Sequence, residues 1–220
     1  MRGRIAIRAG IAALAAVGVT AALAAPGGAA VSTNLIKNPG AEAGAGATNT
    51  TDVVAVPHWA LSNGTHLTAV AYGASGGFPA PGDPGLPTKP GKNFFAGGPY
   101  ENNTSEVAVQ VISLKPYLTD IQAGGVHFHA SAWLGGYTTQ DDNAEVEIDW
   151  KHGTSVVGSS VVLGPVTEAD RDGNTEFLQR SASGKVPKRA NRAYVQIIMN
   201  PVSGGYTDGY ADNLSLTLGS

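Results

Sequence analysis

The chain has 220 residues, of which 42% are hydrophobic and 14% charged, and it contains no cysteine. Three of its 14 Lys and Arg residues fall within the first 30 positions, which contain none of the 17 acidic residues, so the remainder has a net charge of 11 − 17 = −6. Nucleic acids and anionic membranes both require clustered cations, so this balance predicts neither as a partner. Without disulfides, the fold must be stabilised by its hydrophobic core, and a bound metal ion is the other stabilising element open to it.

Residues 1–30 have the pattern of a secretory signal peptide. A basic start with three arginines is followed by an apolar run over residues 9–24 and by small residues that suit cleavage. The apolar run is shorter than the roughly 20 residues of a membrane-spanning helix; a retained anchor is the alternative. We predict a signal peptide over 1–30, one domain over 31–220, a secreted bacterial protein and no membrane contact after cleavage.

Alternation of apolar and polar residues dominates the chain beyond the leader. In residues 144–150, Ala, Val, Ile and Trp take one face and three acids the other, which predicts a half-buried antiparallel strand with Trp150 in the core. Further strands are predicted over 53–56, 67–72, 94–96, 107–114, 126–134, 155–163, 194–199 and 210–218. Short helical turns are expected over 116–121 and 167–172. Residues 75–92 contain five prolines and are expected to form a long surface loop.

Two terminal motifs identify a fold. Asn34-Leu-Ile-Lys-Asn-Pro-Gly-Ala-Glu42 and Asp208-Gly-Tyr-Ala-Asp-Asn-Leu-Ser-Leu216 resemble the ends of galactose-binding-like jelly rolls, the β-sandwich of many bacterial carbohydrate-binding modules. The resemblance covers almost all of the chain after residue 30. It implies an all-β, antiparallel β-sandwich of jelly-roll type whose first and last strands are neighbours, and a role in binding an extracellular polysaccharide or wall glycan.

The same resemblance implies a structural calcium ion. In such modules a Glu near the first strand and an Asp in the last commonly bind calcium together with backbone carbonyls, and the matching residues here are Glu42 and Asp212. Calcium prefers six to eight oxygen ligands, so two carboxylates from opposite chain ends suit it. The family pattern has Phe before the Glu, whereas this chain has Ala41. The alternative is that both carboxylates face solvent.

Glycan binding requires an aromatic face for the sugar ring and polar groups for its hydroxyls. Residues 127–133 place two histidines, Ser131 and Trp133 on the polar face of one predicted strand. We therefore predict a glycan site at Trp133 and Tyr137, with hydrogen bonds from the following loop, Gln140, Asp141, Asp142 and Asn143. The alternative is that Trp133 only covers the sheet beneath a loop. Asp141, Asp142 and Asn143 offer oxygens for a second calcium ion but lack the spacing of a self-sufficient site, so a plain turn is the preferred interpretation there.

Other constellations are weaker. His127 and His129 share a face and would bind zinc or copper only with a third ligand, so a solvated pair is the preferred interpretation. Gly73-Ala-Ser75-Gly-Gly77 matches a hydrolase motif but lacks the strand-to-helix context of a nucleophile. The predicted function is a secreted, non-catalytic carbohydrate-binding module; the alternatives are a surface or matrix protein that binds another protein, and a hydrolase. The oligomeric state is not predicted.

Overall fold

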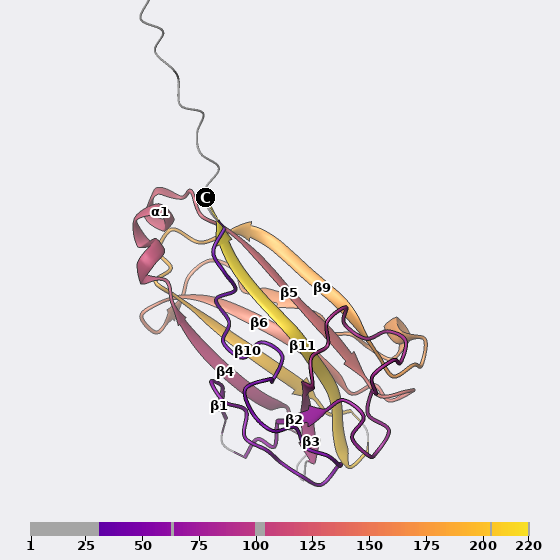
Figure 1. Ribbon diagram of the computed structural model, residues 1–220. Helices are drawn as coiled ribbons and strands as arrows, with labels where there is room; N and C mark the ends of the chain where they lie inside the picture. The colour runs from indigo at the N-terminus through magenta and orange to yellow at the C-terminus, as the bar shows by residue number, and fades with distance from the viewer. Residues whose placement is uncertain (1–30, 63, 100–103, 203, 220) are drawn as a thin grey trace, which may run out of the picture.

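The computed structural model describes residues 31–62, 64–99, 104–202 and 204–219, which form two antiparallel sheets packed face to face (Figure 1). The predicted signal peptide lies outside the described residues. The five-stranded sheet contains, in spatial order, β2 (Thr68–Ala71), β3 (Asn93–Pro99), β11 (Tyr206–Gly219), β5 (His127–Gly136) and β9 (Glu176–Lys185). The six-stranded sheet contains β1 (Ala60–Leu61), β4 (Glu106–Ser113), β10 (Arg192–Asn200), β6 (Asn143–His152) and β7 (Ser155–Val156), with β8 (Val161–Leu163) also paired to β6.

Successive long strands alternate between the two sheets, which gives the jelly-roll connections that the sequence predicts. The chain crosses from one sheet to the other between β3 and β4, β4 and β5, β5 and β6, and again from β9 through β10 to β11. Helical turns are short: η1 (Lys115–Tyr117) and α1 (Leu118–Ala123) follow β4, and η2 (Ala169–Arg171) precedes β9. Among the described residues, no helix has both the length and the apolar character needed to cross a membrane.

The main core lies between the sheets and follows the predicted alternation. Every second residue of β6 and β10 is buried, and the fully buried Trp150 packs its ring 5.2 Å from that of Phe128 on the opposite sheet. Burial of large apolar side chains is the dominant stabilising term in a fold without disulfides. The predicted core position of Trp150 is therefore confirmed.

The two ends of the described chain lie side by side, as the terminal motifs predict. Ser32 and Leu35 donate backbone hydrogen bonds to Leu218 and Leu216 of β11, at 2.7 and 2.8 Å. The first segment is not a regular strand, however. The Asn34 side chain takes the place of a backbone rung, because its amide donates to the Leu214 carbonyl at 2.8 Å and its oxygen accepts from the Leu216 N–H at 3.0 Å.

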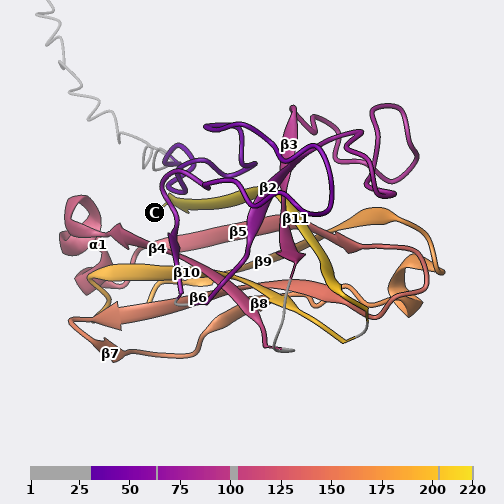
Figure 2. The same ribbon diagram turned by 90° about the horizontal axis from the view of Figure 1, so that it is seen from below.

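The outer faces of the two sheets differ. Figure 2 shows the early part of the described chain lying over the outer side of the five-stranded sheet, while no described segment covers the six-stranded sheet from outside. Under this cover an aromatic cluster forms between the loop and the sheet; its buried or half-buried rings are Tyr72, Phe78, Phe94, Trp133, Tyr137, Phe177, Tyr206 and Tyr210. We call the outer side of the five-stranded sheet the covered face and the outer side of the six-stranded sheet the open face.

Two predicted segments differ from the structure, and one strand was missed. Residues 53–56 form no strand. Residues 155–163 form two short strands because the chain turns at Gly158, where φ is +75° and a Cβ would lie 2.6 Å from the Pro187 ring. Strand β9 was not predicted, since its sequence from residue 179 onward is mostly small and polar. It is an edge strand with one face in solvent, which weakens the apolar signal.

Candidate functional site

The two aromatic residues predicted to stack on a sugar belong to the covered face. Trp133 and Tyr137 are half-buried and pack against the aromatic cluster. A Cβ at Gly77, where φ is +89°, would lie 2.6 Å from the Tyr137 ring, so the backbone of the 75–92 loop rests directly on that ring. Only glycine allows so close an approach in this conformation. Both rings therefore pack inside the protein, Trp133 against the aromatic cluster and Tyr137 against the cluster and the loop.

The polar loop after Tyr137 is mainly a structural junction. Asp142 is fully buried, and its carboxylate accepts hydrogen bonds from the backbone N–H groups of Val202 at 2.6 Å and Asp208 at 2.9 Å. Its oxygens therefore face the protein, and the glycan contact predicted for Asp142 stays a prediction. The other three loop residues, Gln140, Asp141 and Asn143, are exposed or half-exposed.

Arg171, at the end of η2, holds the same loop in place. The side chain is fully buried and donates to the backbone carbonyls of Thr138, Gln140 and Asn174, the Gln140 bond being 2.7 Å. Burial lowers its pKa, because the charged form loses hydration. The two terminal nitrogens of the guanidinium are bonded to carbonyls, while its Nε has no partner among the described residues. These bonds hold the loop in place, which favours a structural role for this end of the sandwich.

The two predicted calcium ligands lie near each other. Asp212 is fully buried on β11, where its carboxylate accepts from the Tyr72 hydroxyl at 2.8 Å and the Asn213 N–H at 2.6 Å. Glu42 is exposed and accepts from the backbone N–H groups of Lys92 and Asn93, each at 2.8 Å. Burial, together with the Glu42 charge, raises the pKa of Asp212 to about 8, although the hydrogen bonds from Tyr72 and Asn213 act to lower it. Asp212 forms no ion pair with any described basic side chain.

The charges of the two carboxylates interact unfavourably. Two acids that repel each other, one of them buried, are stabilised in the ionised form by a nearby positive charge. The described residues contain no group of three or more His, Cys, Asp and Glu side chains placed to bind a metal. Any shell here would therefore be completed by backbone carbonyls and water, as calcium accepts. His127 and His129 are exposed on β5.

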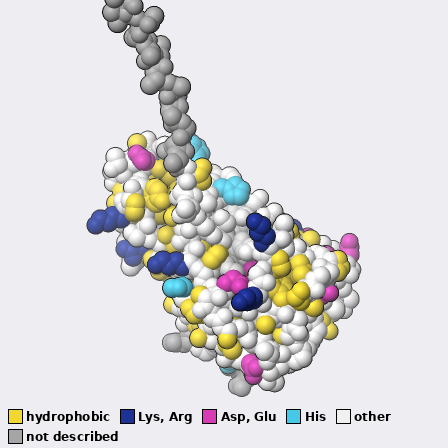
Figure 3. Space-filling model, in the orientation of Figure 1, with side chains coloured by type: hydrophobic (Ala, Val, Ile, Leu, Met, Phe, Trp, Pro, Cys, Tyr) yellow, Lys and Arg dark blue, Asp and Glu magenta, His cyan; other side chains and the backbone are white. Residues whose placement is uncertain are grey.

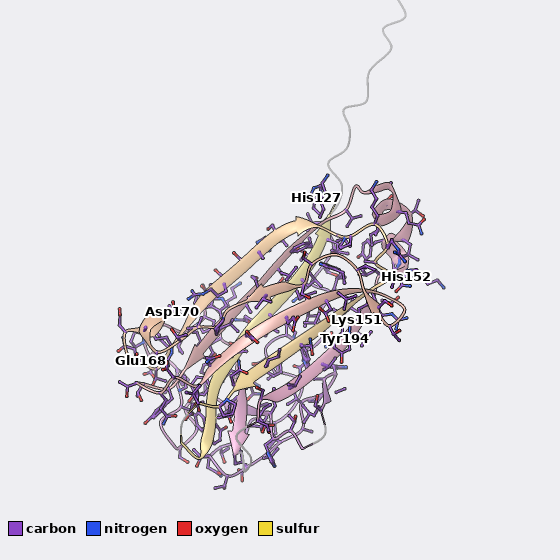
Figure 4. The ribbon with its side chains drawn as sticks, turned by 180° about the vertical axis from the view of Figure 1, so that it is seen from behind. His127, Lys151, His152, Glu168, Asp170 and Tyr194 are labelled. Atoms are coloured by element: carbon purple, nitrogen blue, oxygen red, sulfur yellow. The ribbon has the colours of Figure 1, made fainter. Side chains whose placement is uncertain are left out.

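The open face of the six-stranded sheet has a different chemistry, which the sequence analysis missed. Tyr194 on β10 is half-buried, with Val111 of β4 beside it on one side and Asp149 of β6 on the other. The Lys151 ammonium lies 3.7 Å from the centre of the Tyr194 ring and 3.5 Å from the Asp149 carboxylate. Figure 4 shows Lys151 and Tyr194 next to each other on this face.

Amides and carboxylates continue along the same face. The Gln196 amide of β10 donates to the Glu147 carboxylate of β6 at 3.3 Å, and the Asn200 amide donates to the Asn143 oxygen at 3.1 Å. Burial and the neighbouring charge of Glu147 raise the pKa of Glu145. These side chains project from regular strands in register, so their spacing is fixed by the sheet.

Three hollows border this face at one end. A groove of about 740 Å³ follows the edge of β4 past Lys37, His58 and Trp59, and a hollow of about 180 Å³ lies among Val111, Lys151, Arg192 and Tyr194. Val111, 54% exposed, borders both of them. The third, of about 230 Å³, lies beside α1; it is lined by Leu118, Gln122, His152, Lys188, Arg189, Ala190 and Asn191. The groove is within the size range of ligand sites.

A sequence signal for the open face did exist. Tyr194 and Gln196 have the same parity in the strand predicted over 194–199, and so form a polar face with one aromatic. The same pattern led us to Trp133. The sequence does not show which polar face is left uncovered, because that depends on where the 75–92 loop packs.

The sequence matches no protein-family model and no curated protein. Solved structures do match its fold. A family 16 carbohydrate-binding module is 17% identical over 83% of this chain and 99% of its own, with a TM-score of 0.51. A family 61 carbohydrate-binding module, solved in complex with β-1,4-galactotriose, is 15% identical over 84% of this chain and 98% of its own, with a TM-score of 0.44.

A third match is the enzymatically active domain of tailspike protein 4 from bacteriophage CBA120. It is 13% identical over 84% of this chain, with a TM-score of 0.47, and this chain spans only 21% of its length. At such identities the likeness concerns the fold. The chain has the antiparallel β-sandwich of carbohydrate-binding modules, which confirms the predicted fold class and the resemblance from which it came.

Proposed function

We propose that this protein is a secreted, non-catalytic carbohydrate-binding module that holds an extracellular glycan on the outer face of its six-stranded sheet. One observation supports this above the others. The face is left uncovered by the described chain, and it presents a tyrosine among amide, carboxylate and ammonium groups at a groove. The sandwich likeness to the family 16 carbohydrate-binding module adds support from the fold.

The chemistry of this face suits a sugar. A pyranose ring offers hydroxyls in the plane of the ring, which pair with amides and carboxylates such as Gln196 and Glu147, and apolar C–H faces, which pack on aromatic rings. Because Tyr194 and Gln196 project from one strand and Glu147 from its neighbour, the groups are held in place before the ligand arrives. Preorganisation of this kind lowers the entropic cost of binding.

A non-catalytic role accords with the positions of the reactive groups. Glycoside cleavage requires two carboxyl groups facing each other across the bond, whereas Glu145, Glu147 and Asp149 project side by side from one strand. Ser75, the nucleophile that the hydrolase alternative would require, donates its hydroxyl to the Thr48 backbone carbonyl at 3.1 Å, and a carbonyl cannot act as its general base.

A structural calcium ion belongs to the same proposal. Glu42 and Asp212 would supply its carboxylate oxygens, and the ion would neutralise their mutual repulsion while joining the first segment of the fold to β11. Its place is on the five-stranded sheet, away from the proposed glycan face, so its contribution is to stability.

Binding to a panel of polysaccharides tests the proposal. Tyr194→Ala removes the aromatic ring among the described residues that line the 180 Å³ hollow. We expect it to weaken glycan binding by at least about fivefold, because truncation of an aromatic anchor costs more than about 1 kcal/mol. Affinity electrophoresis or calorimetry on the folded variants measures the change.

Trp133→Ala is the matched control, since it removes a half-buried ring from the other sheet and leaves the open face intact. Loss of binding in Trp133→Ala with full binding in Tyr194→Ala would move the site to the residues first predicted. No binding by the wild-type protein to any glycan, with capture of a single envelope protein instead, would favour the protein-interaction alternative.

A further inference from the structure

The charges of this acidic protein are separated between the two ends of the sandwich. Of the 14 − 3 = 11 Lys and Arg residues after position 30, six come from the strand ends and turns around α1: Lys115, Lys151, Lys185, Lys188, Arg189 and Arg192. Figure 3 shows Lys and Arg side chains together beside α1. We call these six residues the basic end.

Acidic residues concentrate at the opposite end. Strand β6 begins next to Asp141 and ends in Lys151 and His152, and η2 carries Asp170 beside Glu168. In Figure 4 Glu168 and Asp170 lie at one end of the molecule, and Lys151 and His152 lie toward the other. The net charge of the sequence averages over this separation, so composition alone did not reveal a clustered cationic surface.

Most cations of the basic end are free of acidic partners. Only Lys151 forms an ion pair with a described carboxylate, that of Asp149, and the other five form none. Lys115, Lys185, Lys188 and Arg189 are exposed. The acids nearest these six cations are Asp149, paired with Lys151, and Asp120 of α1. Cations therefore outnumber acids at the basic end, and a surface of one predominant sign attracts ligands of the opposite charge.

Lys151 and Arg192 carry this charge onto the proposed glycan face. They are directly opposite each other on β6 and β10, and both line the 180 Å³ hollow with Tyr194. The Lys151 ammonium lies 3.7 Å from the centre of the Tyr194 ring, a favourable cation–π arrangement. The ammonium also pairs with the Asp149 carboxylate at 3.5 Å, whereas Arg192 forms no ion pair with a described carboxylate. An anionic group on a sugar unit packed beside Tyr194 would therefore meet one shared and one unshared cation.

All three hollows at this end are bordered by cations. Arg192 and Lys151 border the smallest, Lys188 and Arg189 the one beside α1, and Lys37 the groove along β4. A chain that follows these hollows meets positive charge at successive positions. Repeated charge along an extended surface fits a polymer with an anion on many of its units.

We infer that the glycan is an acidic polysaccharide, whose carboxylate or sulfate groups bind the basic end at Lys151 and Arg192 while its sugar units extend along the groove of β4. This inference rests on the proposed function and names its ligand class. The feature that carries it is charge complementarity on an otherwise acidic molecule.

Two matched pairs of polymers test the inference: polygalacturonate against the same polymer with its carboxylates reduced to alcohols, and dextran sulfate against dextran. We expect the acidic member of at least one pair to bind at least tenfold more tightly, and the pair that responds identifies carboxylate or sulfate. Raising NaCl from 50 to 500 mM should weaken that binding by about tenfold or more, because salt screens exposed charges.

Lys151→Gln and Arg192→Gln should each weaken binding of the acidic polymer about fivefold or more, the size expected when a charged contact of roughly 1 kcal/mol is lost. Lys89→Gln, which removes one charge from the exposed 75–92 loop, is the matched control and should change affinity by less than twofold.

The outcomes separate the two proposals. Equal affinity for acidic and neutral polymers, unaffected by Lys151→Gln, overturns this inference and leaves the proposed function standing. Absence of binding to every glycan overturns both. Equally tight binding of duplex DNA or of vesicles containing phosphatidylserine also overturns the inference, since the basic end would then recognise anionic polymers or surfaces in general.

Discussion

The Asp212 carboxylate, on the last strand, interacts electrostatically with the Glu42 carboxylate near the start of the described chain. It is fully buried, bonded to the Tyr72 hydroxyl and close enough to Glu42 for their charges to interact. Burial also raises the pKa of Tyr72, so the phenol remains a hydrogen-bond donor. A buried carboxylate in this setting must either keep a proton or gain a cation.

Stability without metal should fall as pH rises. The pKa of Asp212 is about 8 in the fold, against about 3.9 in the unfolded chain. Between these values the folded state holds a proton that the unfolded state has released, so the free energy of unfolding decreases with increasing pH. Calcium competes with this proton and should therefore stabilise more at pH 8.5 than at pH 5.

Thermal melts with calcium and with chelator at both pH values measure this effect. At about 100 times Kd, calcium adds about 2.7 kcal/mol, which is about 5–10 °C at 2–4 °C per kcal/mol for a domain of this size. Asp212→Asn should abolish the calcium response and reduce the pH slope, whereas the exposed Asp52→Asn should retain both. An unchanged calcium response in Asp212→Asn would place the ion elsewhere or show that none binds.

At the scale of elements, the sequence predicts the strands whose one face is core. Strands β4, β5, β6 and β10 alternate clearly because each is buried on one side only. Strand β9 escaped prediction because it lies at a sheet edge and carries serines at 181 and 183. The candidate site was only partly predictable for a related reason: the type of polar and aromatic face was visible in the sequence, but the loop that covers one such face was not.

The 75–92 loop acts as a cover rather than as a free surface loop. Phe78 is buried and packs edge-on against Phe94 at 6.1 Å and Tyr206 at 5.4 Å. Phe78→Ala should cost about 3–5 kcal/mol, the usual range for a buried phenylalanine, and should expose the aromatic cluster. A lower Tm, stronger binding of a hydrophobic dye and faster proteolysis within 75–92 are the expected results.

Ser75→Ala in the same loop is the control. Its hydroxyl makes one exposed hydrogen bond, to the Thr48 carbonyl, so its loss should cost at most about 1 kcal/mol. If Phe78→Ala leaves Tm and proteolysis unchanged, the loop does not hold the cluster closed and the five-stranded sheet regains its place as a candidate binding face.

At the scale of the whole molecule, the decisive contacts join residues far apart in sequence. Tyr194 meets Lys151 across two strands, and the chain ends meet at β11. A sequence pattern shows which face of a strand a residue occupies, but not which residue lies opposite it on the next strand. The terminal motifs were enough to indicate the fold. The basic end became visible only once β6 and β10 were seen to pair. A fold dominated by long-range contacts of this kind is expected to fold slowly.

Asn34 provides a test of how much the union of the two ends stabilises the sandwich. Its side chain bonds the Leu214 carbonyl and the Leu216 N–H on β11, as well as the N–H of Ile36 at 3.1 Å. Asn34→Ala leaves these backbone groups without partners and should cost about 1–3 kcal/mol. Tm should fall by about 2–4 °C for each kcal/mol.

Asn49→Ala is a close match, because the Asn49 side chain also bonds several groups, but all of them lie within its own exposed turn, at Thr51 and Asp52. We expect a much smaller fall in Tm. If the contact between the ends forms after the transition state, Asn34→Ala should speed unfolding and leave the folding rate nearly unchanged. Equal effects of the two variants on Tm, or slower folding in Asn34→Ala, would mean that the ends meet early or contribute little, and that the sandwich is held chiefly by the core around Trp150.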